Sequence, residues 1–225
     1  MYKGLFILFI TLFSVYCKRY GVDISQPCSQ NAFTEMRTKN GVEFVIVRCW
    51  RSLDTTDPNC AASVRAAHSA GMAVGVYFFP CPYNCRKTPQ QQVGEFYQYI
   101  KNNNLEGMIG EVWFDVEGEQ YWSPDKSQNL AIYNDFLKNL LQQGYKQFTV
   151  GVYCSHYQWN RIFESSAKNA YSWMPLWWCR YDGHDSLFYN WQDFGGWTKD
   201  SNVVIKQYRG SSVLQSCGVD LNVMA

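Results

Sequence analysis

The sequence has no excess of either charge, and its only long apolar run lies at the very beginning. It contains 20 lysine and arginine residues against 19 aspartate and glutamate residues, whereas a nucleic-acid-binding protein usually shows a clear basic excess. After residue 17, no apolar run approaches the roughly 18 residues that a transmembrane helix needs. We therefore expect neither a nucleic-acid partner nor a membrane anchor in the mature chain.

Several motifs of cofactor binding and nucleophilic catalysis are also missing. No G-x-G-x-x-G follows the first predicted strand, where a dinucleotide-binding fold would carry it. There is no G-x-S-x-G, the sequence that carries the nucleophilic serine of many hydrolases. The three histidines are scattered and only one close cysteine pair occurs, so zinc ligation is disfavoured. The sequence predicts no metal and no cofactor.

The cysteine count and the N-terminus together indicate a secreted protein. Lys3 precedes the apolar run Leu5–Val15, which is typical of a signal peptide and which we expect to be cleaved after Cys17. Residues 18–225 then form the mature chain, with zero formal net charge and eight of the nine cysteines. Eight cysteines are compatible with four disulfides, a number usual for the oxidising environment outside the cell.

Short β-branched and aromatic runs alternate with helical patterns along the mature chain. Several of the runs are apolar on both faces, as expected of buried parallel strands. The predicted strands are Tyr20–Ser25, Phe44–Trp50, Ala73–Pro80, Ile109–Glu117, Gln147–Cys154, Pro175–Asp182, Val203–Arg209 and Gly218–Asn222. The predicted helices are Ser29–Lys39, Asn59–Ala70, Thr88–Asn102, Asp125–Gln143 and Ser155–Ala167.

This alternation predicts an α/β fold, an irregular TIM-like barrel of eight strands. A complete barrel of eight strand–helix pairs takes about 250 residues, whereas residues 18–225 are too few for it and the last three predicted strands have no helices between them. We expect one domain over residues 18–225. A doubly wound open sheet is the alternative.

Barrel closure also predicts a pairing of the eight mature cysteines. The first and eighth strands become neighbours, and a cysteine lies beside each of them. Two further cysteines end the fifth and sixth strands, and the remaining four lie close together in pairs along the chain. The expected disulfides are Cys28–Cys217, Cys154–Cys179, Cys49–Cys60 and Cys81–Cys85.

Four acidic residues lie at predicted strand ends: Asp23, Asp115, Glu117 and Asp220. The carboxyl ends of the strands form the active-site face of such barrels. Asp115 and Glu117 are two residues apart, so they share one strand face, with backbones about 6–7 Å apart. Two neighbouring carboxyls in a partly dry setting do not both ionise easily, which provides the acid and the anion that glycosidic cleavage requires. The alternative is a solvated pair with a structural role.

Aromatic side chains, with the pair Trp177 and Trp178 among them, also gather near the predicted strand ends, where flat apolar rings suit the faces of sugars. Arg48 lies near the end of the second strand and is a candidate partner for a carboxylate. For each aromatic residue, packing in the core or at the rim is the alternative. The candidate substrate contacts are Tyr77, Phe79, Tyr153, Trp178, Tyr208 and Arg48.

Seven segments together resemble glycoside hydrolase family 25, the Chalaropsis-type lysozymes or N-acetylmuramidases. They follow one another in the family's order over almost the whole mature chain. The segments read GVDIS, AHSAGMAVGVYFF, VWFDVEG, GVYCSHYQW, PLWWCRYD, KQYRG and GVDLN. The chain departs from bacterial members in its eight cysteines, in the residues after Asp23, and in Lys206-Gln207-Tyr208 where W-Q-Y is usual.

The resemblance implies a (β/α)5(β)3 barrel that hydrolyses, with retention, the β-1,4 bond between N-acetylmuramic acid and N-acetylglucosamine in bacterial peptidoglycan. It implies that Glu117 is the acid, that Asp115 is the neighbouring anion, and that Asp23 and Asp220 complete the site. Asp115 then either attacks the sugar or supports the substrate's own N-acetyl group as nucleophile. We expect a secreted monomer that breaks down bacterial walls in digestion or defence. A family 18-like chitinase and a non-catalytic peptidoglycan-binding module are the alternatives.

Overall fold

The computed structural model describes residues 18–144, 147–164 and 170–224, so the expected signal peptide lies outside the described residues. Five strand–helix pairs come first: β1 (Arg19–Ile24) and α1 (Gln30–Asn40), β2 (Val42–Arg51) and α2 (Cys60–Ser69), β4 (Ala73–Phe78) and α3 (Pro89–Asn102), β5 (Glu111–Val116) and α4 (Lys126–Gly144), β6 (Thr149–Cys154) and α5 (His156–Ile162). Three strands follow: β7 (Leu176–Cys179), β8 (Val203–Leu214) and β9 (Cys217–Met224).

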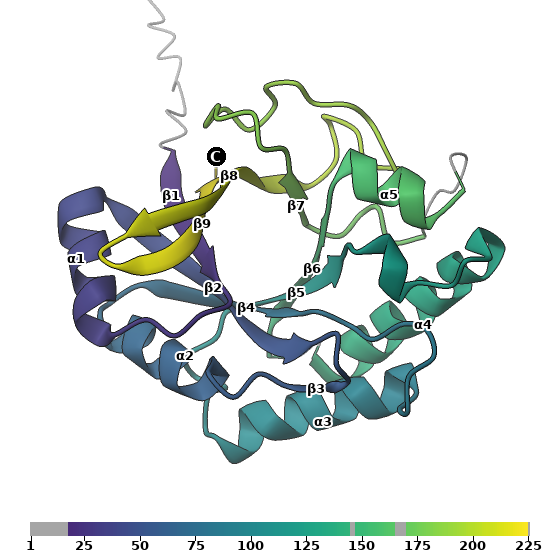
Figure 1. The fold of residues 1–225 in the computed structure, drawn as a ribbon, viewed down its shortest axis with the longest axis horizontal. Helices are drawn as coiled ribbons and strands as arrows, with labels where there is room; N and C mark the ends of the chain where they lie inside the picture. The colour runs from purple at the N-terminus through teal and green to yellow at the C-terminus, as the bar shows by residue number, and fades with distance from the viewer. Residues whose placement is uncertain (1–17, 145–146, 165–169, 225) are drawn as a thin grey trace, which may run out of the picture.

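Eight of the strands form a closed barrel (Figure 1). Their hydrogen-bonded order is β1-β9-β8-β7-β6-β5-β4-β2, and β1 pairs with β2 to close it. Pairing is parallel from β1 through β2, β4, β5, β6 and β7 to β8, whereas β9 runs antiparallel to both β8 and β1. The predicted irregular barrel is confirmed, and the open sheet is excluded.

Helices cover only part of the barrel wall. In Figure 1, α1 to α4 lie in an arc outside the strands, whereas the segment between β7 and β8 crosses its side of the barrel as a loop. A buried ammonium group fixes this loop, since Lys206 Nζ donates to both carboxylate oxygens of Asp182 at 2.9 and 3.0 Å and to the carbonyls of His184 and Tyr189. The loop therefore takes the place of a covering helix.

Two groups of apolar side chains fill the fold. The larger lies between the barrel and its helices, and the smaller fills the barrel interior, with Phe44, Ile46, Trp113 and Ile205 among its members. The indole of Trp113 has room inside the barrel because glycine occupies position 151 on the neighbouring strand β6. A Cβ there would lie 2.4 Å from Trp113 Cζ3, far closer than van der Waals contact allows.

Local signals place most helix ends close to their predicted positions. The Thr88-Pro89 pair begins α3 as a capping box, in which Thr88 Oγ1 accepts from the backbone N–H of Gln91 and the Gln91 side chain accepts from that of Thr88. The predicted helix Ser155–Ala167 was too long, because α5 ends at Ile162; residues 165–169 lie outside the described residues.

Two strand predictions were clearly wrong in extent, and a third strand was not predicted at all. β7 is shorter than its predicted range and ends at Cys179. β8 continues to Leu214, five residues beyond Arg209, and forms a long antiparallel hairpin with β9. A short strand β3 (Thr55–Thr56), which the sequence did not predict, pairs with the end of β2. The hairpin matters most, since it extends beyond the barrel rim as the yellow arrows of Figure 1.

Three of the four expected disulfides form: Cys28–Cys217, Cys49–Cys60 and Cys81–Cys85. The Cys28–Cys217 bond joins the segment after β1 to the first residue of β9. Because β9 is antiparallel to β1, the beginning of β9 lies at the same rim as the end of β1. In an all-parallel barrel these two positions would lie at opposite rims. The bond therefore ties the projecting hairpin to the barrel.

The expected Cys154–Cys179 disulfide is wrong, since both cysteines are free. The register of β6 and β7 explains why. Cys154 lies opposite Trp178, not Cys179, and successive side chains of a strand point to opposite faces. Cys154 accordingly packs in the outer core, whereas Cys179 packs against the cluster inside the barrel. Among the residues that the structure describes, no helix combines the length and apolar character needed to cross a membrane.

Candidate active site

A cavity of about 430 Å³ opens at the barrel rim where the parallel strands end, and it contains all four predicted acids. The carboxyls of Asp23, Asp115, Glu117 and Asp220 all line it. The β8–β9 hairpin forms one wall with residues 211–213 and 218–219. The cavity thus combines an acidic floor with a wall that the Cys28–Cys217 disulfide holds in place.

Two pairs of strand positions bring the acids together. Asp115 lies in β5 and Glu117 directly follows this strand, so their spacing of two residues points both side chains into the cavity. Asp23 of β1 lies directly opposite Asp220 of β9 in the strand register. The prediction that Asp220 ends its strand was wrong, since it lies within β9. It reaches the same rim because β9 runs antiparallel.

A chain of buried hydrogen bonds holds the floor of the cavity. Gln207 Nε2 donates to Asp23 Oδ2 at 2.8 Å and to Asp220 Oδ2 at 3.2 Å, and its Oε1 accepts from the Tyr153 hydroxyl at 2.7 Å. Asn222 Nδ2 also donates to Asp23 Oδ2, at 2.7 Å, while its Oδ1 accepts from Trp177 Nε1 at 2.8 Å. One oxygen of Asp23 therefore accepts two amide N–H groups and is held in a fixed position.

Burial makes these carboxyls reluctant to ionise. Burial first, and then the nearby Asp220 carboxylate, raises the pKa of Asp23 from 3.8 to about 7. Burial and the neighbouring Glu117 raise the pKa of Asp115 well above its usual value, and Arg48 partly opposes this. Burial, together with Asp220, also raises the pKa of Glu117. Asp115 and Glu117 thus behave as a pair that retains a proton at pH values where surface carboxyls have lost theirs.

The two members of this pair differ in access. Asp115 is 4% exposed, and its Oδ1 is buried without a hydrogen-bond partner among the described residues. Glu117 is half-buried and lines both this cavity and a neighbouring one. A buried, unpaired oxygen is unfavourable unless a ligand supplies a donor. Asp115 is therefore placed to accept a hydrogen bond from a bound molecule, and Glu117 to reach an atom between the two cavities.

Arg48 lines the cavity, as predicted, but its main partner lies outside the group of four acids. Its Nε donates to Asp57 Oδ2 at 2.7 Å, and Nη2 donates to the carbonyl of Ser25 at 3.2 Å. Asp57 is 1% exposed, so this ion pair is fixed by burial. The positive charge of the guanidinium partly offsets the rise in the pKa of Asp115 that burial and Glu117 cause.

Three of the five predicted aromatic contacts line the acidic cavity: Tyr77, Phe79 and Tyr153. Trp178 does not line it. This side chain points to the outer face of β7, where its Nε1 donates to the carbonyl of Leu187, and it lines the neighbouring cavity instead. Tyr208 lines neither cavity, because it follows the inward-pointing Gln207 and so points outward.

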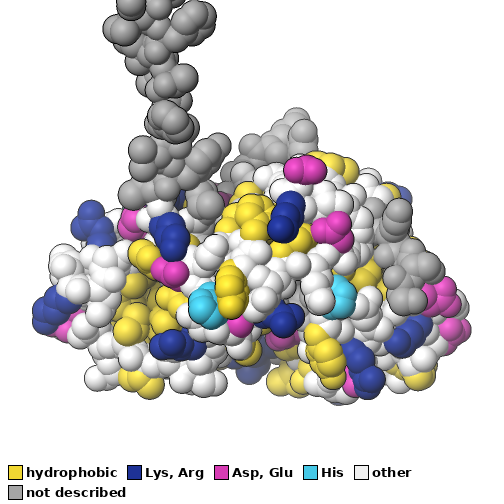
Figure 2. All heavy atoms as spheres, turned by 90° about the horizontal axis from the view of Figure 1, so that it is seen from above, with side chains coloured by type: hydrophobic (Ala, Val, Ile, Leu, Met, Phe, Trp, Pro, Cys, Tyr) yellow, Lys and Arg dark blue, Asp and Glu magenta, His cyan; other side chains and the backbone are white. Residues whose placement is uncertain are grey.

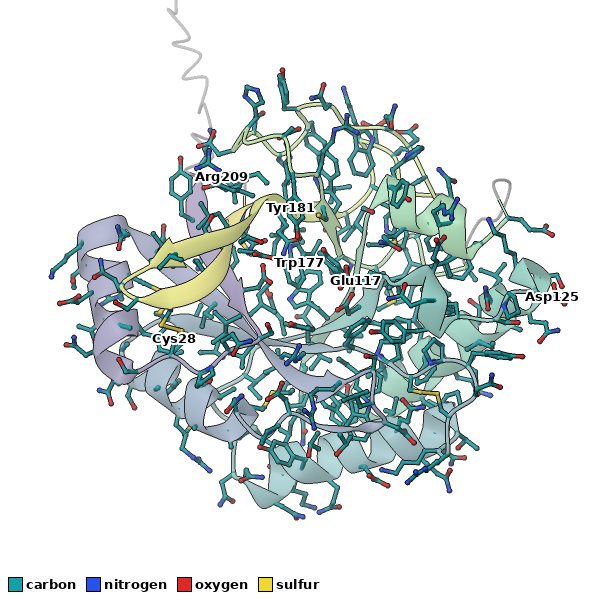
Figure 3. All side chains as sticks on the ribbon, in the orientation of Figure 1. Cys28, Glu117, Asp125, Trp177, Tyr181 and Arg209 are labelled. Atoms are coloured by element: carbon teal, nitrogen blue, oxygen red, sulfur yellow. A yellow bond between two sulfur atoms is a disulfide. The ribbon has the colours of Figure 1, made fainter. Side chains whose placement is uncertain are left out.

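The sequence analysis missed Gln207 and Tyr181 as residues of the site, and of the neighbouring pair Trp177 and Trp178 it chose Trp178 as the candidate contact where Trp177 lines the cavity. Figure 3 shows Trp177 and Tyr181 directed toward the barrel centre near Glu117, and all three line the cavity with the acids. Successive side chains of a strand point to opposite faces, and this rule would have identified two of them. Trp177 and Cys179 share the inner face of β7, whereas Trp178 points outward. In the same way, Ile205 and Gln207 share the inner face of β8. Nothing local identifies Tyr181, which follows the end of β7.

Within the described ranges, no group of three or more histidine, cysteine, aspartate and glutamate side chains is arranged to hold a metal ion. The carboxyls of Asp23 and Asp220 are instead held by amide N–H groups. Tyr181 adds a donor to Asp220, with its hydroxyl 3.3 Å from Asp220 Oδ2. The surface seen in Figure 2 mixes basic and acidic side chains, in keeping with the near-zero charge of the chain.

Known proteins resemble this chain along nearly all of its length. The family model described as Lysozyme-like protein 1 matches residues 15–208. Probable GH family 25 lysozyme 2 of Dictyostelium discoideum is 36% identical over 220 residues, which cover 97% of each chain. Probable GH family 25 lysozyme 5 of the same organism is 31% identical over 222 residues, 97% of this chain and 95% of its own.

A solved structure, that of a family GH25 lysozyme from Aspergillus fumigatus, shares the fold. It superposes with a TM-score of 0.67 over 93% of this chain and 94% of its own, at 18% sequence identity. At that identity the likeness supports the barrel alone.

Proposed function

The chain belongs to the glycoside hydrolase family 25 lysozymes, and we propose that it hydrolyses, with retention, the β-1,4 bond between N-acetylmuramic acid and N-acetylglucosamine in bacterial peptidoglycan. The observation that carries the proposal is the cavity in which Asp115 and Glu117 share a strand face above the paired Asp23 and Asp220. Glycosidic cleavage needs a carboxylic acid and an anion beside one bond, and these residues supply both.

Glu117 is the acid in this mechanism. Its raised pKa keeps a proton available, and its position between the two cavities places it beside a bond that runs from one to the other. It donates its proton to O4 of the leaving N-acetylglucosamine as the bond to the anomeric carbon breaks. It then takes a proton from the water molecule that attacks this carbon, and so returns to its starting state.

Asp115 supports the substrate's own N-acetyl group as the internal nucleophile. Its unpaired Oδ1 accepts the N–H of that group, and the acetyl oxygen bonds to the anomeric carbon. This contact also stabilises the Asp115 anion, so substrate binding shifts the shared proton towards Glu117. Two successive inversions at the anomeric carbon give net retention. Direct attack by Asp115 is the alternative mechanism. Substrate that carries free amines in place of N-acetyl groups distinguishes the two, since it stays intact only in the first.

We propose that residues 1–17 are a cleaved signal peptide and that residues 18–225 are secreted as a monomeric single-domain enzyme. The three disulfides support this location, because disulfides persist in oxidising compartments. Breakdown of bacterial walls outside the cell, or in a digestive vesicle, serves digestion or antibacterial defence.

The direct test is a comparison of substrates with leader-free, oxidised protein. We expect clearing of a Gram-positive peptidoglycan suspension with release of muramic acid reducing ends, and no release of sugar from chitin. Cleavage of chitin instead would show a chitinase. Folded protein that sediments with peptidoglycan and releases nothing between pH 3 and 8 would show a binding module, and either result would overturn the proposal.

A further inference from the structure

A second cavity of about 520 Å³ adjoins the acidic one, and apart from Glu117 its lining residues have no role in the proposed mechanism. The two cavities share Glu117, Tyr153 and Tyr181. They therefore meet at the proposed acid, and a chain that is cut at Glu117 has to extend into both. Since the acidic cavity holds Asp115 and takes the muramic acid unit being attacked, the second cavity is available for the leaving half of the substrate.

The second cavity differs from the first in charge. Four carboxyls line the acidic cavity, whereas Glu117 is the only acid among the residues that line the second one, which also include Arg161 and Arg180. Its wall presents exposed aromatic rings as well, with Tyr157 66% exposed and Tyr181 60% exposed. This combination of aromatic faces and guanidinium groups suits sugar rings that carry an anionic substituent.

The two arginines are not equivalent. Arg161 is already neutralised, because its Nε and Nη2 both donate to the carboxylate of Glu119. Among the residues that the structure describes, the one ion pair of Arg180 is a distant one, with its Nε 3.8 Å from Asp182 Oδ2. The Asp182 carboxylate is itself occupied by the buried Lys206 ammonium at 2.9 and 3.0 Å. Arg180 thus retains a largely uncompensated charge at the cavity wall, with its side chain 45% exposed.

We propose that the second cavity binds the leaving half of peptidoglycan and that Arg180 binds a carboxylate of the peptide stem carried by the next muramic acid residue. This inference rests on the proposed function and adds a substrate requirement to it. Leaving-group N-acetylglucosamine bears no anion, but the muramic acid beyond it carries a stem rich in carboxylates. Arginine recognises a carboxylate through paired N–H donors, so the enzyme prefers glycan that retains its stems.

The experiment uses two soluble substrates: uncrosslinked peptidoglycan strands with their stems, and the same strands after an amidase has removed the stems. Hydrolysis of that amide leaves the lactyl carboxylate on each muramic acid, so the comparison tests the carboxylates of the stem itself. Arg180→Gln is expected to lower kcat/KM about tenfold on stem-bearing strands, equivalent to about 1.4 kcal/mol, and to leave the value for stem-free strands within about twofold. Calorimetry in a Glu117→Gln background measures the Kd for each kind of strand. Arg180→Gln should weaken the binding of stem-bearing strands and leave the binding of stem-free strands unchanged.

One control variant separates recognition from charge alone. Arg65→Gln removes an exposed positive charge from helix α2, whose residues line neither cavity. This variant should match the wild type on both substrates. The inference would be overturned if Arg180→Gln lowered kcat/KM equally on the two substrates, or lowered it on neither. If the wild type cleaves neither, the proposed function fails, and the Kd values alone decide the role of Arg180.

Discussion

Replacement of Asp23 by asparagine should stabilise the protein at neutral pH. Asp23 is 8% exposed, and burial together with Asp220 raises its pKa from 3.8 to about 7. A carboxyl with a higher pKa in the folded than in the unfolded state binds more protons when folded. The free energy of unfolding therefore falls as the pH rises from about 4 to about 7, and changes no further above that.

The magnitude follows from the two pKa values. The difference between 3.8 and about 7, at 1.36 kcal/mol per pKa unit, corresponds to about 4 kcal/mol of lost stability above pH 7. Asparagine has the same shape and no charge, and its amide oxygen can still accept from Gln207 and Asn222. The variant should therefore gain up to about 4 kcal/mol at pH 8 and nothing at pH 3.5.

Urea unfolding at half-unit steps from pH 3.5 to 8.5 measures this difference for the wild type and Asp23→Asn. Asp125 offers a control of opposite sign at the outer edge of the fold (Figure 3), because hydrogen bonds from Ser127 and Gln128 lower the pKa of its carboxyl. Asp125→Asn should be less stable than the wild type at neutral pH, and this difference should shrink as the pH falls towards 3.5 and the carboxyl begins to take up a proton. The reasoning would be refuted if Asp23→Asn did not raise the free energy of unfolding at pH 8, or raised it by the same amount at pH 3.5.

Three further substitutions test the packing and connections of the site. Gln207→Ala leaves a buried carboxylate with one donor fewer, and should reduce the free energy of unfolding at pH 8 by about 2 kcal/mol in urea titrations. Gly151→Ala places a Cβ 2.4 Å from Trp113 Cζ3 and should reduce stability by about 1–3 kcal/mol, whereas Gly107→Ala, with nothing within 4 Å, should unfold at nearly the wild-type temperature. Cys217→Ser opens the disulfide that holds the hairpin wall and should cost about 2–5 kcal/mol, with faster amide hydrogen exchange across residues 211–218. Unchanged exchange there would contradict the role given to this bond.

The barrel and its rim of acids were predictable because short-range patterns determine them. Runs apolar on both faces marked the buried strands, and Thr88-Pro89 marked a helix start. The spacing of Asp115 and Glu117 placed both on one strand face. These features need only neighbouring residues in the chain, and the structure agrees with them.

The errors arose where strand direction or register mattered. The antiparallel course of β9 brings Asp220 and Cys217 to the active-site rim, and no local pattern in GVDLN reveals that course. A shift of one residue decides whether Trp177 or Trp178 faces the cavity, and it likewise separates Cys154 from Cys179. Gln207 was overlooked because its three hydrogen bonds reach β9 across the hairpin and also β1 and β6, which are distant in sequence.

The central claim, that Glu117 is the acid of a muramidase, is tested most directly by Glu117→Gln. The amide is close in shape to the carboxyl, so the variant should keep the wild-type melting temperature and sediment with peptidoglycan as the wild type does. We expect wild-type protein to release muramic acid reducing ends and the variant to release them about a hundredfold to ten-thousandfold more slowly, the range that one general acid contributes. Release at the wild-type rate by folded Glu117→Gln would contradict the account.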